Sequence, residues 1–261
     1  MPEGHTIHRL ARDMADDLLG RPVEASARQE RFADGAHRLD GQVLTGTDAH
    51  GKHLFLHWDS GDVLYVHLGL IGKFARHPLP APQPSPNLRL RLAGQGAAWD
   101  LTGPMACELR DPDVVEQIAG TLGPDPLRRR ADPQRFVAAV RRSRKPIGAL
   151  LLDQSVLAGI GNVYRAELLH LAGIDPNRPG TSITEDEART LWRLAVEQLR
   201  LGLKRNRIVT VPLGGRRLTS VPREDSWHVY KQERCRTCGD AVVLSQVGNR
   251  TSYACATCQP A

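Results

Sequence analysis

The chain opens with Met1-Pro2-Glu3-Gly4-His5-Thr6-Ile7-His8-Arg9-Leu10-Ala11. If Met1 is removed, Pro2 becomes a secondary amine with a free lone pair, followed at once by the carboxylate of Glu3. Such an amine can attack an aldehyde-like carbon and form an iminium ion. A free α-amino group has a reference pKa of about 7.7 to 8, so a useful fraction is unprotonated near neutrality.

The same stretch predicts an amphipathic helix that begins just after Gly4, because apolar residues recur there at helical spacing. The positive end of this helix would lie near the Pro2 amine and disfavour its ammonium form. Gly4 has no Cβ and lets a substrate backbone approach closely. Taken alone, the stretch is more simply explained as an ordinary chain start, since proline is common in the first turn of helices. The apolar positions are Ile7, Leu10, Ala11, Met14 and Leu18.

Composition limits the class of protein. The 261 residues are 41% hydrophobic and 25% charged, which is typical of a globular chain long enough for two domains. The net charge of +6 and the isoelectric point near 9.3 favour a polyanionic partner, either nucleic acid or an acidic membrane surface. No apolar run has the length of a membrane span, and the N-terminus lacks the apolar core of a signal peptide. We therefore expect a cytoplasmic protein without membrane association.

Residues 20 to about 127 are predicted to be mostly strand. Leucines alternate with arginines over 88–92, which indicates a half-buried strand, and further strands are expected at 42–46, 52–58, 62–67 and 97–99. This spacing favours a sandwich or a barrel. The proline-rich segment 77–86 is expected to be a loop rather than a strand.

From residue 128 the apolar period becomes helical. The basic run Arg128-Arg129-Arg130 opens a linker, and helices are expected over 133–143, 145–154, 161–172 and 184–206. Within this part, Gly159 and Gly161 allow a tight turn whose N–H groups, with the amide of Asn162, could hold a phosphate. Glycines at such a corner can also serve only to turn the chain.

The strongest local signal is a pair of C-x-x-C motifs separated by sixteen residues, near the end of the chain. This spacing suits four thiolates around one structural zinc ion, in a module that begins near residue 227 and is too small for an adequate core without metal. Between the motifs we expect a hairpin that turns at Gly248-Asn249, with Arg250 at its tip, either in contact with phosphate or merely solvated. Cys107 is expected to be a small buried hydrophobe. The four predicted ligands are Cys235, Cys238, Cys255 and Cys258.

Taken together, motifs along nearly the whole chain resemble the formamidopyrimidine-DNA glycosylase and endonuclease VIII family. The resemblance implies an α+β fold with an N-terminal β-sandwich and leading helix (1–127), a helix-two-turn-helix domain (128–222) and a zinc-finger hairpin (227–261). It also implies a base-excision repair enzyme that binds damaged DNA in a cleft. The motifs, in order, are Met1-Pro2-Glu3-Gly4, Gly51-Lys52, His67-Leu68-Gly69-Leu70-Ile71-Gly72, Leu122-Gly123-Pro124-Asp125-Pro126-Leu127, Ala158-Gly159-Ile160-Gly161-Asn162-Val163-Tyr164 and the two cysteine pairs.

The resemblance assigns a role to each matching residue. Pro2 matches the nucleophile that attacks the sugar C1′, and Glu3 matches the group that handles proton transfers. Lys52 matches a lysine that contacts the phosphate near the lesion and assists base release. The remaining matches are His67, Asn162 and Arg250 as phosphate contacts around the extruded nucleotide, and Leu70 and Ile71 as the apolar wedge that fills the gap.

Three departures from the family pattern bear on specificity. Purine-type members carry Arg and Phe after an Asp-Pro that we align with Asp111-Pro112, whereas this chain has Asp113-Val114, so it is expected to lack that second wedge. Residues 207–227 show no clear match to the lid over oxidised guanine. Thr6 replaces a frequent second carboxylate, and His5 is a candidate for part of its role. The first two departures favour the endonuclease VIII branch and oxidised pyrimidines such as thymine glycol and dihydrouracil.

Three functions follow from this sequence. The first is a bifunctional DNA glycosylase and abasic-site lyase of the endonuclease VIII type, which cuts the strand by β- and δ-elimination and acts as a monomer on nucleoid DNA. The second is the same chemistry with purine lesions such as 8-oxoguanine preferred. The third is a non-catalytic, zinc-dependent binder of damaged DNA. Only the first two need a free Pro2 amine, and hence the removal of Met1.

Overall fold

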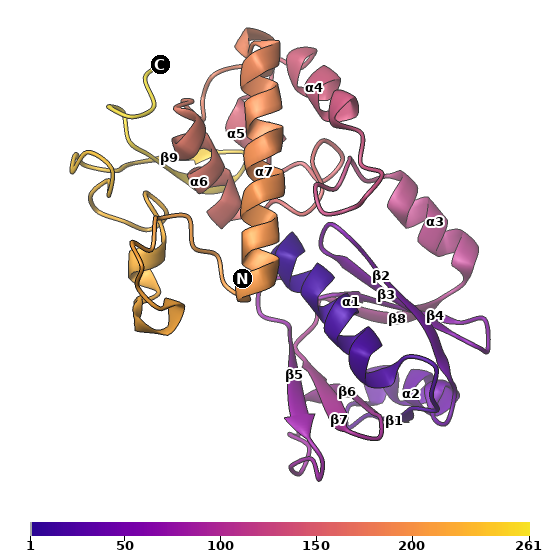
Figure 1. The fold of residues 1–261 in the computed structure, drawn as a ribbon. Helices are drawn as coiled ribbons and strands as arrows, with labels where there is room; N and C mark the ends of the chain where they lie inside the picture. The colour runs from indigo at the N-terminus through magenta and orange to yellow at the C-terminus, as the bar shows by residue number, and fades with distance from the viewer. Residues whose placement is uncertain (1) are drawn as a thin grey trace. The chain divides into compact units, whose positions relative to one another are not determined.

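The computed structural model describes residues 2–261, and the expected removal of Met1 concerns a residue outside this range. The chain divides into two compact units, Met1–Thr121 and Leu122–Ala261 (Figure 1). The helices after residue 122 and the cysteine-bearing hairpin belong to the same unit. The expected three-part division, with boundaries after residues 127 and 222, stays a prediction.

The first unit contains two antiparallel four-stranded sheets, with the strand orders β1-β6-β7-β5 and β2-β3-β4-β8. Buried residues of both sheets and of α1 (Gly4–Leu18) form one core, which gives the sandwich that the sequence predicts. The strands are β1 (Glu24–Ser26), β2 (Leu44–His50), β3 (His53–Trp58), β4 (Val63–His67), β5 (Lys73–Pro78), β6 (Leu88–Ala93), β7 (Ala97–Thr102) and β8 (Ala106–Arg110).

The predicted periodicities are confirmed where one face of an element is buried. All five apolar positions predicted for α1 are buried. In β6 the leucines are buried and Arg89 and Arg91 are half-buried. Cys107 is buried as expected, and burial raises the pKa of its thiol to about 12.

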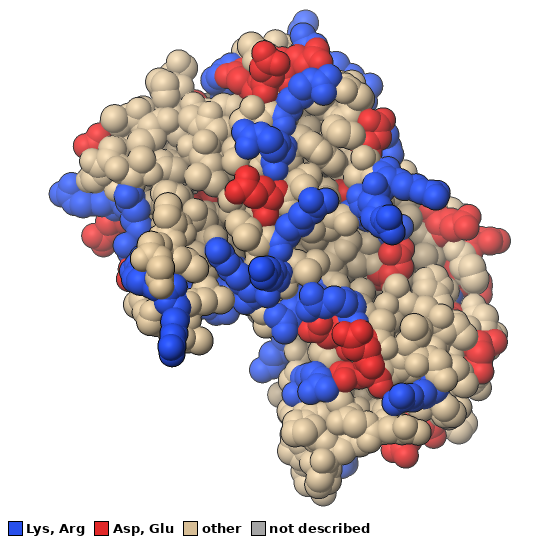
Figure 2. All heavy atoms as spheres, viewed as in Figure 1, with Lys and Arg blue, Asp and Glu red and all other residues tan. Residues whose placement is uncertain are grey.

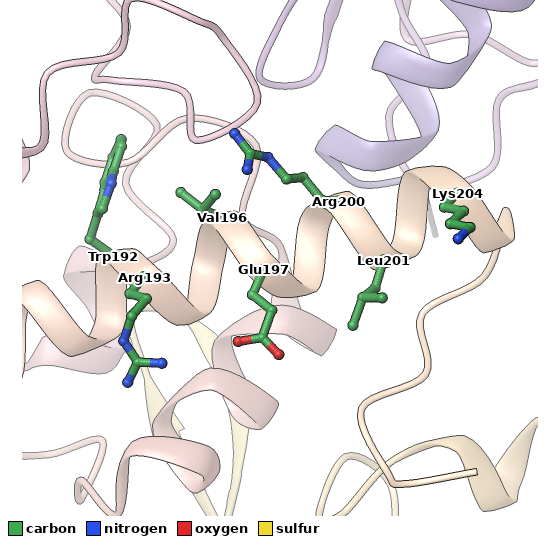
Figure 3. Close-up of a pocket in the computed structure, with 7 residues that line it drawn as sticks. All are labelled: Trp192, Arg193, Val196, Glu197, Arg200, Leu201 and Lys204. Carbon is green, nitrogen blue, oxygen red and sulfur yellow. The ribbon is translucent and has the colours of Figure 1, made fainter. Parts of the chain in front are cut away.

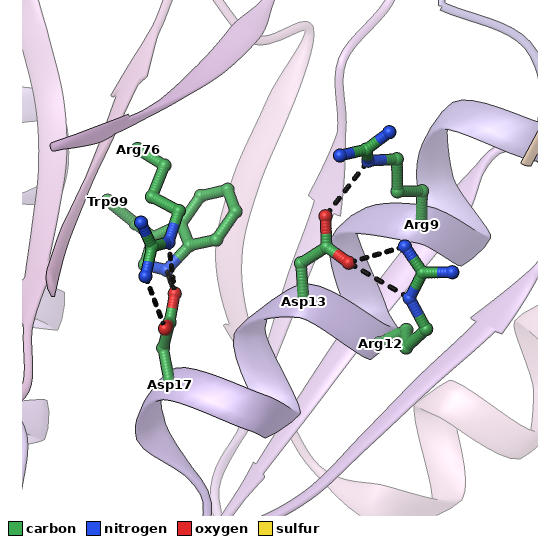
Figure 4. Close-up of polar contacts among 6 residues, drawn as sticks. All are labelled: Arg9, Arg12, Asp13, Asp17, Arg76 and Trp99. Atoms are coloured by element: carbon green, nitrogen blue, oxygen red, sulfur yellow. Dashed lines mark hydrogen bonds and ion pairs between the residues drawn. The ribbon is translucent and has the colours of Figure 1, made fainter. Parts of the chain in front are cut away.

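Asp17 ties the end of α1 to the first sheet (Figure 4). Its carboxylate accepts two hydrogen bonds from Arg76 of β5, at 2.7 and 2.8 Å, and one from the indole N–H of Trp99 in β7, at 2.9 Å. The bonds from Arg76 lower the pKa of Asp17. One turn earlier, Asp13 accepts from Arg9 and Arg12 on the helix surface. The leading helix is therefore fixed by polar contacts as well as by its apolar stripe.

The sequence prediction for this unit was wrong in two places. Residues 20–127 include two helices besides the strands, α2 (Ala33–Leu39) and α3 (Pro112–Gly120). His77 and Pro78 end β5 instead of starting the loop. Proline is tolerated there because β5 lies at the edge of its sheet, where a strand does not need every N–H group for pairing.

The second unit is mainly helical, with α4 (Pro133–Arg141), α5 (Ile147–Leu150), α6 (Asn162–Ala172) and α7 (Glu185–Arg205). A capping box starts α7: the Thr184 hydroxyl accepts from the N–H of Glu187, whose carboxylate accepts from the N–H of Thr184. The expected helix over 145–154 is only one turn, because the chain turns at Asp153, which accepts from the backbone and hydroxyl of Ser155.

The hairpin consists of β9 (Val243–Val247) and β10 (Arg250–Ala254), as the sequence predicts. Its two turn residues, Gly248 and Asn249, both have positive φ, at 61° and 56°. This conformation matches the type I′ turn that suits a two-residue hairpin.

None of the helices between residues 2 and 261 has the length and apolar character that crossing a membrane requires.

Candidate active site and metal centre

Pro2 and Glu3 lie directly before α1. Glu3 is the N-cap residue, with extended backbone (φ −125°, ψ 179°), but its side chain makes no capping hydrogen bond. The side chain is completely buried, whereas Pro2 is half-buried. The positive end of α1 favours the ionised carboxylate and disfavours a protonated amine nearby. A carboxyl group thus stands next in sequence to the predicted nucleophile, at a helix end that keeps an amine nucleophilic.

His5 does not replace the missing carboxylate of Thr6 as a proton carrier. Burial lowers the pKa of His5 to about 4, and its ring is only 4% exposed in the fold. The Thr6 hydroxyl lies 3.3 Å from its Nε2. A histidine with this pKa is neutral at pH 7 and is a weak base, so the environment of His5 does not favour a role as proton carrier.

Lys52 lies in the two-residue turn that joins β2 to β3. His50 pairs with His53 across this turn, and Gly51 takes a φ of 58°, which glycine adopts without strain. The helix α1 packs against both strands of this hairpin. The charge of Lys52 contributes to lowering the pKa of both His53 and His67, so these side chains share one electrostatic environment.

His67 ends β4 and is a neutral hydrogen-bond donor. The backbone N–H of Gly69 donates to its Nδ1 at 3.1 Å, so the proton of the neutral ring is on Nε2. Burial, and secondarily Lys52, lowers its pKa. The ring of His53 lies edge-on to it, with centroids 5.0 Å apart, and bonds to the Tyr65 hydroxyl at 3.0 Å. The ammonium group of Lys52 and the Nε2–H of His67 suit an anion such as phosphate.

Leu70 and Ile71 form an exposed apolar turn together with a residue that the sequence did not indicate, Met105. Their exposed fractions are 55%, 83% and 69%, which is unusual for large apolar side chains. The N–H of Met105 donates to His67 O, and a Cβ on Gly69 would lie 2.9 Å from the Cβ of Met105. Met105 therefore packs on Gly69, the residue before the predicted wedge.

Asp111-Pro112, with which we align the second wedge, lies at the start of α3. Asp111 is the N-cap of α3 and Asp113 lies in its first turn, so neither belongs to the loop beside Leu70. The segment that contacts the Gly69–Ile71 turn precedes β8, because β4 and β8 pair at His67 and Ala106. Met105 had no signal of its own in the sequence, since its position follows from this long-range pairing.

Asn162 begins α6 and contacts the cysteine hairpin. Its Nδ2 donates to Thr251 O at 3.1 Å, and its Oδ1 is buried. Arg165, one turn later, is fully buried and donates to Val247 O at 2.8 Å and to Thr251 O at 2.7 Å. These bonds hold the turn before Arg250 against the start of α6. Asn162 and Arg250 are the two residues of this unit that are predicted to contact phosphate. Asn162 lies at the start of α6 and Arg250 lies in the hairpin, and Arg165 joins these two segments.

Arg250 is exposed at the first position of β10, and its side chain has no ion pair within residues 2–261. The glycine turn before α6 is fixed by Gln154, whose Oε1 accepts from Gly159 N and whose Nε2 donates to Ile160 O. Like Arg165, Gln154 carried no local signal, because its partners are defined only by the folded chain.

The four predicted ligand cysteines form a cluster. Their sulfur atoms all lie within 4.8 Å of one another, with Cys235 and Cys258 at 3.9 Å and Cys238 and Cys255 at 3.4 Å. A tetrahedral site with metal–sulfur bonds of about 2.3 Å needs sulfurs roughly 3.8 Å apart, so the cluster fits a metal ion such as zinc. Thr237 N donates to Cys235 Sγ, a hydrogen bond that stabilises a thiolate and orients it toward a metal ion.

The structure alone therefore defines a two-unit α+β protein. Its first unit contains the two sheets, and its second unit contains the helices and the four-cysteine hairpin. Residues 1–104 match the model of the formamidopyrimidine-DNA glycosylase N-terminal domain, and residues 122–211 match the model of the formamidopyrimidine-DNA glycosylase H2TH domain.

The relatives span the whole chain. "Endonuclease 8 1" of Mycobacterium tuberculosis strain H37Rv is 43% identical over 267 residues, which cover 99% of this chain and all of that protein. A formamidopyrimidine-DNA glycosylase of Nocardia farcinica is 31% identical, with 100% and 98% covered. The structure of the Lactococcus lactis formamidopyrimidine-DNA glycosylase with abasic-site DNA superimposes with a TM-score of 0.80 at 24% identity, over 99% and 100% of the two chains.

The chain belongs to the formamidopyrimidine-DNA glycosylase and endonuclease VIII family, whose members are DNA glycosylases with abasic-site lyase activity.

The buried His5 and the half-buried His53 predict an acid-labile fold. The pKa of His53 is lowered to about 4, as is that of His5, chiefly by burial. Below about pH 6.5 the unfolded chain therefore binds more protons than the folded one, so stability is full above that pH and is lost as the pH falls toward 4. We expect each histidine to contribute about 2 to 3 kcal/mol to this loss. Urea unfolding measures the free energy of unfolding at pH 7 and at pH 4.5. The difference between the two values should be smaller in His53→Gln than in the unmodified chain. An equal difference would contradict the lowered pKa of His53.

Arg165→Met should loosen the hairpin. The substitution removes the Arg165 donor to the Val247 carbonyl oxygen and one of the two side-chain donors to the Thr251 carbonyl oxygen, which we expect to lower the unfolding free energy by about 2 kcal/mol. Amide exchange of β9 and β10 should accelerate more than that of α7. Arg193→Met, at an exposed position of α7, is the matched control and should leave exchange in the hairpin unchanged. Equal exchange rates in both variants would show that Arg165 does not hold the hairpin.

Proposed function

We propose that this chain is a bifunctional DNA glycosylase and abasic-site lyase that removes oxidised bases, with pyrimidines preferred. The proposal rests above all on the buried carboxyl of Glu3 beside Pro2 at the positive end of α1. The pyrimidine preference is supported by the 43% identity to a protein named endonuclease 8. It is also supported by the absence of an arginine and a phenylalanine from the segment 103–106 that lies beside the wedge turn.

The reaction begins at the Pro2 nitrogen after removal of Met1. Its lone pair attacks the sugar C1′, the bond from C1′ to the base breaks, and the base leaves with the electron pair and gains a proton. The Pro2 nitrogen then loses its own proton, and the bond from C1′ to the ring oxygen O4′ breaks as O4′ gains a proton, which opens the sugar ring and leaves an iminium ion at C1′. The resulting iminium ion acidifies the C2′ proton, whose removal expels the 3′ phosphate by β-elimination, and a second, δ-elimination expels the 5′ phosphate. Glu3 carries the protons in these steps, and water finally releases Pro2.

Four side chains hold the DNA backbone in this proposal. Lys52 supplies a cation near the lesion, and the neutral His67 supplies the Nε2–H donor beside it. Asn162 and Arg250 supply an amide and a guanidinium from the second unit. Base flipping requires such contacts because the extruded nucleotide must be held against restacking.

The gap left by the flipped base is filled by three apolar side chains. To the predicted Leu70 and Ile71 we add Met105, which is exposed and packs on their turn. Flexible thioether and branched aliphatic groups can stack on bases without a hydrogen-bond preference. The wedge therefore comes from two loops, β4–β5 and β7–β8, that each connect the two sheets of the first unit.

We assign one structural zinc ion to Cys235, Cys238, Cys255 and Cys258. When bound, the ion would crosslink the two ends of the β9–β10 hairpin and thereby support Arg250. We further propose that the protein acts as a monomer on damaged DNA in the cytoplasm.

Borohydride trapping on a duplex that contains thymine glycol tests the chemistry. Reduction of the iminium ion should lock the mature protein to DNA, whereas Pro2→Gly, or a chain that retains Met1, should give no trapped complex. Glu3→Gln should reduce base release by at least about a hundredfold, since a proton-transfer group is lost. If the mature protein leaves no trapped complex, it is a binder of damaged DNA without catalysis.

Lesion preference is measured on the same duplexes. We expect faster base release from thymine glycol and dihydrouracil than from 8-oxoguanine. The opposite order would establish the purine-preferring alternative while leaving the chemistry at Pro2 intact.

Metal content tests the cysteine site. Mass spectrometry of the native protein should find one zinc ion per chain, and Cys255→Ser should lose it together with DNA affinity. Cys107→Ser, at the buried thiol outside the cluster, is the control and should keep both. Full DNA binding after complete metal loss would contradict the supporting role of the hairpin.

A further inference from the structure

One exposed face of α7 forms a groove that the proposed DNA repair reaction does not use. Its volume is about 590 Å³, and every residue that lines it belongs to this helix. Figure 3 shows the side chains in two rows along the helix. One row holds Trp192, Val196, Arg200 and Lys204, and the other holds Arg193, Glu197 and Leu201.

Only Trp192 of the apolar groove residues packs against the core, whereas Val196 and Leu201 are not part of it. The buried face of α7 consists of other residues, such as Leu191, Ala195 and Leu199. Of the groove residues, Trp192 is anchored by Phe136, with ring centroids 6.0 Å apart. Val196 and Leu201 remain half-exposed. An aromatic and two aliphatic side chains in a groove are typical of a surface that receives a helix.

In the described part of the chain, the cationic side chains of the groove make no ion pair that stabilises the fold. Arg193, Arg200 and Lys204 are exposed, and none of them has an ion pair or a side-chain hydrogen bond within residues 2–261. Figure 2 shows Lys and Arg side chains along the line that α7 follows in Figure 1. Three cations and one carboxylate, Glu197, give this face a net positive charge.

This set of groups suits an acidic protein segment better than DNA. A DNA surface makes many phosphate contacts, whereas the groove offers three cations with a carboxylate among them. Its apolar side chains would gain nothing from a phosphate backbone. Guanidinium groups pair well with carboxylates, and the apolar groups can bury matching side chains.

We propose that this face of α7 is a docking site for an acidic, amphipathic helix of a partner protein. The groove residues span 192–204, so the site accommodates a helix roughly 18 Å long, or about 12 residues. Arg193 and Arg200 are seven residues apart, and Lys204 follows after four. Carboxylates one and two turns apart on the partner meet these cations while its apolar stripe lies against Trp192, Val196 and Leu201.

Binding of a designed peptide tests the site in the full-length protein. The probe is a labelled, blocked peptide of about 15 residues with leucine or phenylalanine at every third or fourth position and glutamate elsewhere. Fluorescence anisotropy should give saturable binding with a Kd of the order of 10 μM. The double variant Arg193→Glu/Arg200→Glu should weaken it roughly tenfold or more, and Leu201→Ser should also weaken it.

The matched control is Arg135→Glu/Arg142→Glu. These exposed arginines on and after α4 have the same spacing and the same change in net charge, so peptide affinity should change little. A version of the peptide with lysine for glutamate should not bind. No saturable binding up to about 1 mM, or equal losses in both double variants, would overturn the proposal.

Two further measurements exclude other occupants. Affinity for undamaged duplex DNA should fall equally in the groove variant and in the control, and a selective fall in the groove variant would make this face a DNA surface and overturn the proposal. Sedimentation should show that the protein does not self-associate through the groove. Self-association that Leu201→Ser abolishes would assign the groove to a second copy of the chain and overturn the proposal.

Discussion

The second unit depends on two charged side chains buried within one helix. Arg165 and Glu167 of α6 are completely buried. Arg165 donates to carbonyl oxygens of the hairpin, and Glu167 accepts from three successive backbone N–H groups, those of residues 228–230. A buried ion is tolerated only when such bonds are complete. The hairpin and its entry segment can therefore dock on α6 in only one way, and that docking fixes the cysteine cluster and the turn before Arg250.

In the first unit, the site residues lie at the ends of helices and strands. Glu3 stands at the start of α1, Lys52 in a two-residue turn and His67 at the last position of β4. Sheet register sets the latter two, because His53 pairs with His50 on one side and with His67 on the other. The consequence is electrostatic as well as geometric. Burial lowers the pKa of the half-buried His67 and so favours its neutral form, which offers an anion a neutral donor beside the Lys52 side chain.

Sequence periodicity and spacing predicted what depends on neighbours in the chain. The stripe of α1, the alternation in β6 and the paired cysteines are of this kind, since burial of one face or binding of one ion is encoded over a few residues. Met105 and Arg165 were missed because their partners lie 36 or more residues away and are brought near by strand pairing or by helix packing. The chemistry of Pro2 and Glu3 was equally invisible in the opening stretch alone, and it was the order of motifs along the whole chain that gave those residues roles.

Helix α6 also explains how two surfaces can work independently. It packs against α7 and against β10, so its two charged anchors serve the hairpin while its apolar side chains join α7 to the common core. The groove on α7 shares no residue with Asn162 or the hairpin. A protein segment in that groove would contact none of the residues proposed to hold phosphate in the second unit. A partner held there would therefore increase the local concentration of the enzyme without altering its chemistry, which is the effect expected of tethering.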